Sequence, residues 1–151
     1  MPWRVTGAVW LICLLILPGA FADDLPGVAN ANRARVNYML NCQGCHGPEG
    51  VATIEGVVPP MQGSMARFLH VDGGRSFLVQ VPGSANAGLG DAALAEVLNW
   101  MLWTFDARHV PSDFSPYGAE EVGTLRRTPL DQVIPVRAKL VAALQEAGLA
   151  D

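Results

Sequence analysis

The segment Cys42-Gln43-Gly44-Cys45-His46 constrains this chain of 151 residues more than any other feature. Cys-x-x-Cys-His is the spacing at which a chain attaches haem covalently and binds its iron. The thiols of Cys42 and Cys45 can each form a thioether with a haem vinyl group, and the short loop leaves His46 beneath the iron as proximal axial ligand. The motif therefore predicts one haem c per chain.

Two other uses of a Cys-x-x-Cys pair agree less well with the sequence. A redox dithiol follows a buried strand, whereas residues 37–41 have the composition of the end of a polar-faced helix. A zinc site needs four ligands, but the chain has no second Cys pair, and His70 and His109 lie far apart in sequence. Covalent haem attachment is therefore the preferred interpretation.

The first 22 residues have the pattern of an export signal. Arg4 supplies a positive charge, residues 7–17 form an uncharged apolar run, and Ala20-Phe21-Ala22 is an A-x-A cleavage site. We expect a signal peptide over residues 1–22, a mature chain that starts at Asp23, and a periplasmic location. An uncleaved membrane anchor is the alternative, because the length of the apolar run does not decide between them.

Net charge narrows the class of partner, and the cysteine count indicates whether disulfides are expected. The chain has 10 basic and 14 acidic residues, a formal charge of −4, and removal of residues 1–22 would make it −5. This argues against binding to nucleic acid or to an anionic membrane surface, and favours a soluble redox partner with a basic docking patch. Once residues 1–22 are removed, two cysteines remain, and the haem motif uses both. We therefore expect no disulfide framework.

Hydrophobic periodicity predicts an all-α fold. A first helix over residues 29–41 would carry Val36, Met39 and Leu40 on one side and lead into the haem motif. The strongest helical pattern runs over residues 91–105, with Trp100 and Trp103 beside its apolar face as core residues. That face is formed by Leu94, Val97, Leu98, Met101, Leu102 and Phe105.

The remaining segments are predicted as follows. Residues 47–63 have loop composition, and residues 75–81 fit a short helix or an extended segment. A short helix over 117–127 and a last helix from Pro135, with Val136, Leu140 and Leu144 on one side, would form a structured extension. We therefore divide the chain into a signal peptide at 1–22, a haem domain at 23–106 and a helical extension at 107–151.

From Ala29 to Phe105 the chain resembles the class I c-type cytochromes. Five segments carry the resemblance: the haem motif, Gly47-Pro48-Glu49-Gly50, residues 56–61, residues 88–95, and Asn99-Trp100. The resemblance implies a small helical domain around one haem, a helix over 75–81, and transfer of single electrons. It also implies that the carbonyl of Pro59 or Pro60 accepts the N–H of His46 and so orients the imidazole.

The chain departs from that family in the segment that normally carries the distal methionine. Residues 81–88, Val-Pro-Gly-Ser-Ala-Asn-Ala-Gly, contain no methionine, histidine or lysine. The sixth iron ligand is therefore left open among Met65, His70, Met61 and no protein ligand, with Met61 expected on the proximal side. His109 and Tyr117 could close over the haem from the extension, and Met101 is expected in the core.

Three functions remain. The preferred one is a one-electron carrier, free or as the cytochrome subunit of a dehydrogenase system, and not an enzyme. The alternative is a haem protein with an open distal site that binds a gas or reacts with peroxide. A third is a structural subunit that docks through its extension. Glu120-Glu121 is not expected to be a catalytic pair, since adjacent residues face different sides of a helix, and Arg126-Arg127 is expected to be solvated.

Overall fold

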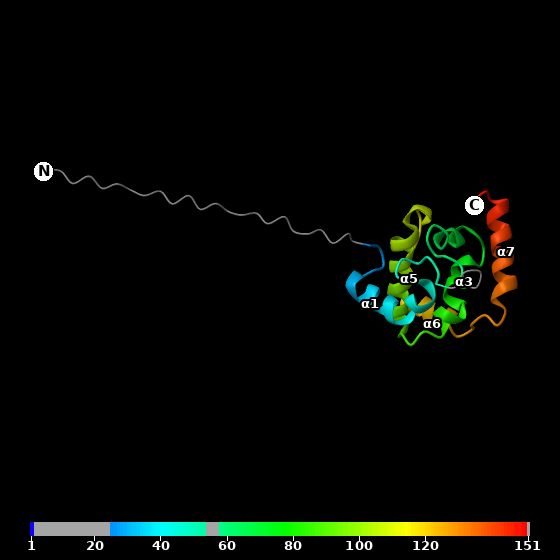
Figure 1. The fold of residues 1–151 in the computed structure, drawn as a ribbon, viewed down its shortest axis with the longest axis horizontal. Coiled ribbons are helices and arrows are strands. Elements are labelled where there is room, and N and C mark those ends of the chain that lie inside the picture. The colour runs from blue at the N-terminus through cyan, green and yellow to red at the C-terminus, as the bar shows by residue number, and fades with distance from the viewer. Residues whose placement is uncertain (2–24, 54–57, 151) are drawn as a thin grey trace.

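The computed structural model describes Met1 and residues 25–53 and 58–150, and all regular elements within these residues are helices (Figure 1). The predicted all-α fold is confirmed. The proposed signal peptide lies outside the described residues, apart from Met1. The elements, in chain order, are α1 (Ala31–Asn41), α2 (Gln43–His46), the 3-10 helix Ala66–His70, α3 (Gly74–Gln80), α4 (Pro82–Ala85), α5 (Asp91–Asp106), the 3-10 helix Ala107–His109, α6 (Ala119–Leu125) and α7 (Val133–Glu146).

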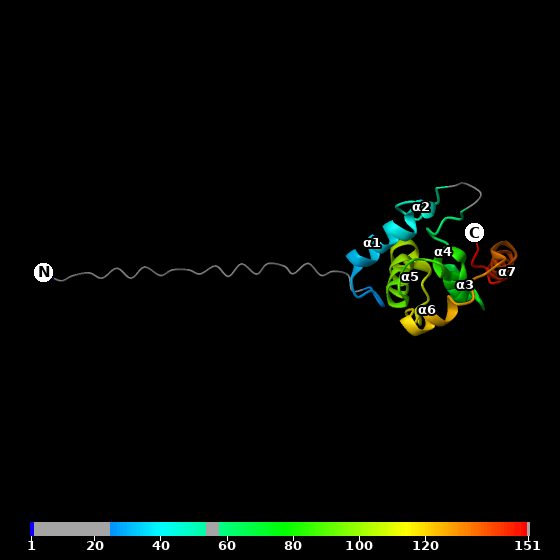
Figure 2. The ribbon, with the colours of Figure 1, turned by 90° about the horizontal axis from the view of Figure 1, so that it is seen from below.

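Helix α5 is the centre of the fold, with α1 and α6 packed against it (Figure 2). Its predicted apolar face is buried, except that Phe105 is only half-buried. Trp100 is a core residue as expected, whereas Trp103 is half-buried and donates its ring N–H to the carbonyl of Pro26 at 3.1 Å. Burial on more than one side makes such a helix the main contributor to the hydrophobic core. The buried members of that face are Leu94, Val97, Leu98, Met101 and Leu102.

Helix α1 confirms the predicted element but not the predicted face. Its buried residues are Ala34 and Tyr38, whereas Val36, Met39 and Leu40 are 51%, 45% and 77% exposed. The aromatic ring decides this orientation, because Tyr38 packs against two rings of α5 that also contact each other, and it buries more area than an aliphatic side chain. Its ring centroid lies 5.4 Å from that of Trp100 and 5.2 Å from that of Phe105.

The segment over residues 74–80 is a helix, α3, as the family resemblance implied. It packs closely on the 3-10 helix Ala66–His70, since a Cβ on Gly74 would overlap the carbonyl oxygen of Phe68. Only glycine allows this approach. Helix α4 was not predicted, and it begins with Pro82 in its first turn, where a missing N–H costs nothing.

The C-terminal part of the chain is structured and contacts the rest of the molecule at several places. Helix α6 packs on α5 and α3, and Arg75 of α3 forms an ion pair with Glu121, with Nε 2.6 Å from Oε1. Helix α7 runs along one side of the molecule (Figure 1) and buries Leu140 and Leu144. Among the described residues, no helix is both long enough and apolar enough to cross a membrane.

Candidate functional site

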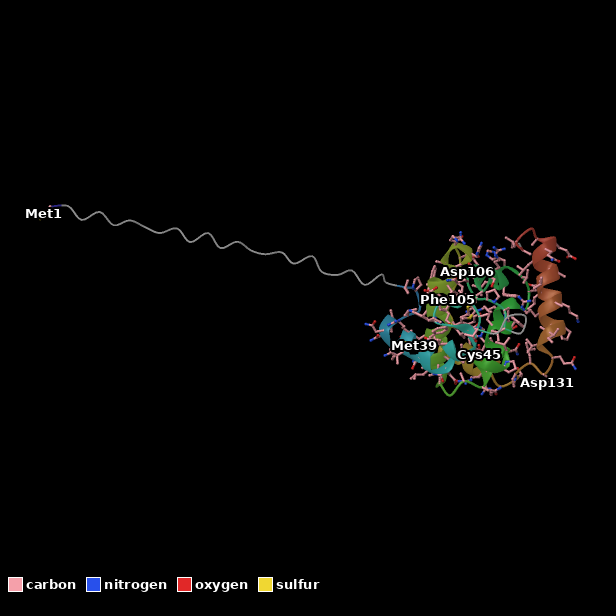
Figure 3. The ribbon with its side chains drawn as sticks, viewed as in Figure 1. Met1, Met39, Cys45, Phe105, Asp106 and Asp131 are labelled. Carbon is pink, nitrogen blue, oxygen red and sulfur yellow. The ribbon has the colours of Figure 1, made fainter. Side chains whose placement is uncertain are left out.

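The three residues of the predicted site lie on one helical turn directly after α1. The N–H of Cys42 donates to the carbonyl of Tyr38 at 2.8 Å, and the N–H of His46 donates to the carbonyl of Cys42 at 3.1 Å. Cys42 is half-buried and Cys45 is exposed, and both are free thiols (Figure 3 labels Cys45). The structure thus carries the two thiols and the imidazole on a single turn of backbone.

The loop after His46 folds back over this turn. The N–H of Ala52 donates to the carbonyl of His46 at 3.1 Å, and the N–H of Thr53 donates to that of Cys45 at 3.0 Å. The hydroxyl of Tyr38 donates to the carbonyl of Gly47, which ties the start of the loop to α1. These bonds fix the backbone of the motif without using any of its side chains.

Burial determines the protonation of the site. It raises the pKa of the Cys42 thiol to about 11, and the neighbouring Cys45 adds to that rise. Burial also lowers the pKa of His46 below 6.5. At neutral pH the chain therefore presents a thiol at Cys42 and a neutral imidazole, the form of histidine that binds metals.

One atom of the site has no hydrogen-bond partner among the described residues. The side chain of His46 is half-buried, and its Nδ1 atom is buried and makes no hydrogen bond to any described residue. Buried polar atoms are almost always paired, so Nδ1 needs a hydrogen-bond partner to complete the site, and Nε2 is the ring nitrogen that remains for a metal. A pair of free thiols beside a neutral imidazole has the donor set of a covalently attached haem, and the residues present fit that group.

The predicted support for His46 lies beside the same loop. The N–H of Met61 donates to the carbonyl of Gly50 at 2.7 Å, so the segment with Pro59 and Pro60 runs next to the turn that follows the histidine. Both prolines are exposed, and the carbonyl of Pro60 accepts a bond from the hydroxyl of Ser64 at 2.6 Å. The role of either proline toward Nδ1 stays a prediction.

The candidates for the sixth ligand lie in different surroundings. Met65 is 5% exposed and belongs to the core, and Met61 is half-buried against it. His70 is exposed, and its Nε2 lies 2.8 Å from the carbonyl oxygen of His109. Met101 is buried in α5, as expected for a core residue.

The two candidates from the extension already have partners. The ring of His109 is bonded through Nδ1 to the buried carboxylate of Asp106. The hydroxyl of Tyr117 donates to the carbonyl of Arg75 at 2.8 Å. Both side chains therefore join the extension to the rest of the fold.

One arginine of the C-terminal extension was predicted wrongly. Arg126 was expected to be solvated, but its side chain is only 14% exposed, and its guanidinium bonds to the segment that precedes α5. Arg127 is exposed, as expected. No sequence signal separates these adjacent arginines, because the partners of Arg126 are backbone carbonyls about 40 residues away.

Comparison with known proteins places the chain in a family. It is 34% identical over 137 residues to a cytochrome c-552 of Thermus thermophilus, an alignment that covers 77% of this chain and 91% of the relative. A second cytochrome c-552 of the same species is 36% identical over 120 residues, covering 66% of this chain and 90% of the relative. No family model matches the chain.

The helical fold, with a histidine and two free thiols on one turn, has the features of a c-type haem protein. With relatives of this similarity over most of their length, the chain belongs to the class I c-type cytochromes. Membership implies a covalently bound haem c, a redox protein as partner, and electron transfer rather than an enzymatic reaction.

Proposed function

We propose that this chain is a monohaem c-type cytochrome that carries single electrons in the periplasm, free or as the cytochrome subunit of a dehydrogenase system. The observation that carries the proposal is the placement of the Cys42 and Cys45 thiols and the neutral imidazole of His46 on one turn of backbone. One haem per chain follows from the single Cys-x-x-Cys-His motif in the sequence. Cys42 and Cys45 are its attachment points, and His46 is the proximal ligand.

The haem, when bound, supplies an iron that changes its charge by one unit. The chain keeps the imidazole of His46 neutral, because burial lowers its pKa, so that Nε2 is available to the iron. The carbonyl of Pro59 or Pro60 is the proposed acceptor for the N–H at Nδ1, which would fix the ring plane. The ring of Phe105 packs over the loop that follows His46, since a Cβ on Gly50 would lie 3.1 Å from Cγ of Phe105.

The surface of α1 supports contact with a redox partner. Val36, Met39 and Leu40 are exposed on the helix that ends next to Cys42. No acidic residue lies between residues 25 and 48, so contact at this surface would be apolar and would not use the basic docking patch expected from the net charge of the chain. Exposed apolar patches of this kind commonly mark protein contacts, and a patch beside the haem attachment site would place the partner within electron-transfer reach.

The second candidate function is a haem protein with an open distal site that binds a gas or reacts with peroxide. One observation favours it: residues 81–88 offer no iron-binding side chain. Peroxide chemistry would also need an acid or base placed over the iron, and the acid–base groups His109 and Tyr117 are engaged elsewhere.

Mass spectrometry and absorption spectroscopy of the exported protein test both functions. The carrier predicts one covalent haem on a chain that starts at Asp23, and a sharp low-spin spectrum of the reduced protein that carbon monoxide leaves unchanged. A large shift on addition of carbon monoxide would favour the open distal site. His46→Ala should abolish the low-spin spectrum, and an unmodified chain would disprove haem attachment altogether.

A further inference from the structure

Tyr38 links the two ends of the haem turn, residues 42–46. It lies one helical turn before Cys42, whose N–H donates to the carbonyl of Tyr38 at 2.8 Å. The side-chain hydroxyl of Tyr38 donates to the carbonyl of Gly47, the residue directly after His46. One residue therefore holds the backbone on both sides of the two thiols and the imidazole.

The chain leaves the haem turn at Gly47. This residue has φ 70° and ψ 167°, and its N–H ends α2 by donating to the carbonyl of Gln43 at 2.8 Å. A positive φ of this kind suits glycine, because a Cβ crowds the backbone there. The chain then folds back, since the N–H of Ala52 donates to the carbonyl of His46 at 3.1 Å. The bond from Tyr38 thus fixes the first peptide of the returning loop.

The ring of Tyr38 fixes the position of its hydroxyl. The side chain is 1% exposed, and its ring centroid lies 5.4 Å from that of Trp100 and 5.2 Å from that of Phe105, both on α5. A buried ring that packs against two others has little freedom to move. The position of the donor is therefore determined by the central helix of the fold.

Phe105 connects the ring of Tyr38 to the segment that holds the proposed acceptor for His46. The ring of Phe105 lies against Gly50, where an added Cβ would be 3.1 Å from Cγ. The carbonyl of Gly50 accepts from the N–H of Met61 at 2.7 Å, directly after the two prolines. The hydroxyl donor and the acceptor segment are thus held by the same packed aromatic rings.

The imidazole of His46 depends on this arrangement. Its Nδ1 atom is buried and has no hydrogen-bond partner among the described residues, so it needs an acceptor when Nε2 binds the iron. A hydrogen bond from the second ring nitrogen makes a histidine ligand more basic, and a more basic ligand stabilises the oxidised iron. The backbone on either side of His46 determines where the ring lies relative to that acceptor.

We propose that Tyr38 is a positioning residue: its hydrogen bond to Gly47 holds the backbone after His46, so that the imidazole keeps its acceptor and the reduction potential of the haem is lowered. The inference rests on the proposed function, since it requires a haem bound by His46. It gives the hydroxyl a role that the ring does not have. The ring stabilises the core, and the hydroxyl tunes the iron.

The first test is the reduction potential of the holoprotein, measured by potentiometric titration. Tyr38→Phe keeps the ring and removes only the hydroxyl, and it should shift the redox equilibrium about tenfold toward the reduced state, a rise of about 59 mV. Tyr117→Phe is the matched control, because Tyr117 is 4% exposed and its hydroxyl donates to the carbonyl of Arg75 in α3 rather than to the haem turn. Its potential should equal that of the wild type, although its stability falls.

A second readout reports on the imidazole directly. The reduced low-spin holoprotein is diamagnetic, so exchange of the His46 ring N–H with deuterium can be followed by NMR. The exchange should be about tenfold faster in Tyr38→Phe than in the wild type, because the acceptor is held less firmly. In Tyr117→Phe the exchange rate should equal that of the wild type.

Phe105→Leu keeps the proposal testable should Tyr38→Phe not retain haem. It leaves the hydroxyl present but removes the ring that packs against Tyr38 and Gly50, so its potential should also rise, and an unchanged potential there would overturn the proposal.

Three other results would overturn the proposal. One is an unchanged potential and exchange rate in Tyr38→Phe, with only lower stability. Another is a fall in its potential, because water that reached the haem would favour the more highly charged oxidised iron. The third is an equal shift in Tyr117→Phe. Failure of the proposed function is distinguishable from all of these, because it would appear as a wild-type chain without covalent haem.

Discussion

The side-chain amide of Asn99 and the backbone of Tyr117 bind each other in both directions. Oδ1 of Asn99 accepts from the N–H of Tyr117 at 2.9 Å, and Nδ2 donates to the carbonyl of Tyr117 at 3.1 Å. Nδ2 also donates to the carbonyl of Gly27 at 3.1 Å. A single fully buried side chain of α5 therefore fixes both the segment before α1 and the start of the C-terminal part.

Replacing this amide should destabilise the protein strongly. Asn99→Ala leaves the N–H and carbonyl of Tyr117 without their partner in a buried site, which should lower the free energy of unfolding by about 3 kcal/mol. Denaturant unfolding of the holoprotein measures the change. Asn32→Ala, on the exposed face of α1, is the control and should change it by less than about 0.5 kcal/mol. A similarly small change in Asn99→Ala would show that water replaces the lost bonds.

The ion pair between Arg33 and Glu96 should make stability sensitive to acid. Arg33 Nε lies 2.8 Å from Oε2 and Nη2 lies 2.7 Å from Oε1, and the side-chain bond to Arg33 lowers the pKa of Glu96 below 4.5. A carboxyl whose pKa is lower in the folded state contributes stability above its unfolded pKa and loses it as pH falls through the folded pKa. The contribution is therefore complete at neutral pH and declines below pH 4.5.

Glu96→Gln tests this linkage. The variant should be less stable than the wild type at pH 7, and the difference should shrink as the pH is lowered below 4.5, because only the wild type loses an ion pair there. Urea unfolding of both holoproteins at a series of pH values measures the difference. The contributions of titrating groups that both proteins share cancel in this difference. A difference that stays constant down to about pH 3 would contradict the assignment.

The exposed apolar face of α1 should control electron transfer between protein molecules. Leu40→Glu should slow electron self-exchange between reduced and oxidised protein by about tenfold. Contact between two molecules through this face would bury the new carboxylate and bring it close to the same carboxylate of the other molecule, and both effects oppose association. NMR line broadening of mixed redox states gives the rate. Ile134→Glu is the control, since Ile134 is 84% exposed on α7, away from the haem motif, and its rate should not change. Equal slowing in both variants would place the contact elsewhere.

Sequence reasoning predicted what depends on neighbouring residues and failed where distant segments meet. The candidate site could be proposed because Cys42, Cys45 and His46 lie within one short motif, and α5 because its apolar positions repeat over 16 residues. The buried face of α1 was wrong, since the choice of Tyr38 depends on the rings of α5. The contacts of Arg126 were missed because they join a side chain to carbonyls of another segment, which have no sequence signature.

The identity of the sixth ligand also depends on how distant segments of the chain meet. Substitution of the candidate residues identifies it. His70→Ala should leave the low-spin spectrum of the reduced holoprotein unchanged, because the ring of His70 is exposed and bonded to the carbonyl of His109. Met65→Leu conserves volume in the core, so any loss of that spectrum would report a lost sulfur ligand rather than misfolding. Met61→Leu tests the other methionine candidate and should leave the spectrum unchanged, since the backbone of Met61 is bonded to the loop that follows His46. A spectrum lost in His70→Ala would mean that the segment from residue 66 to 70 rearranges when haem is bound.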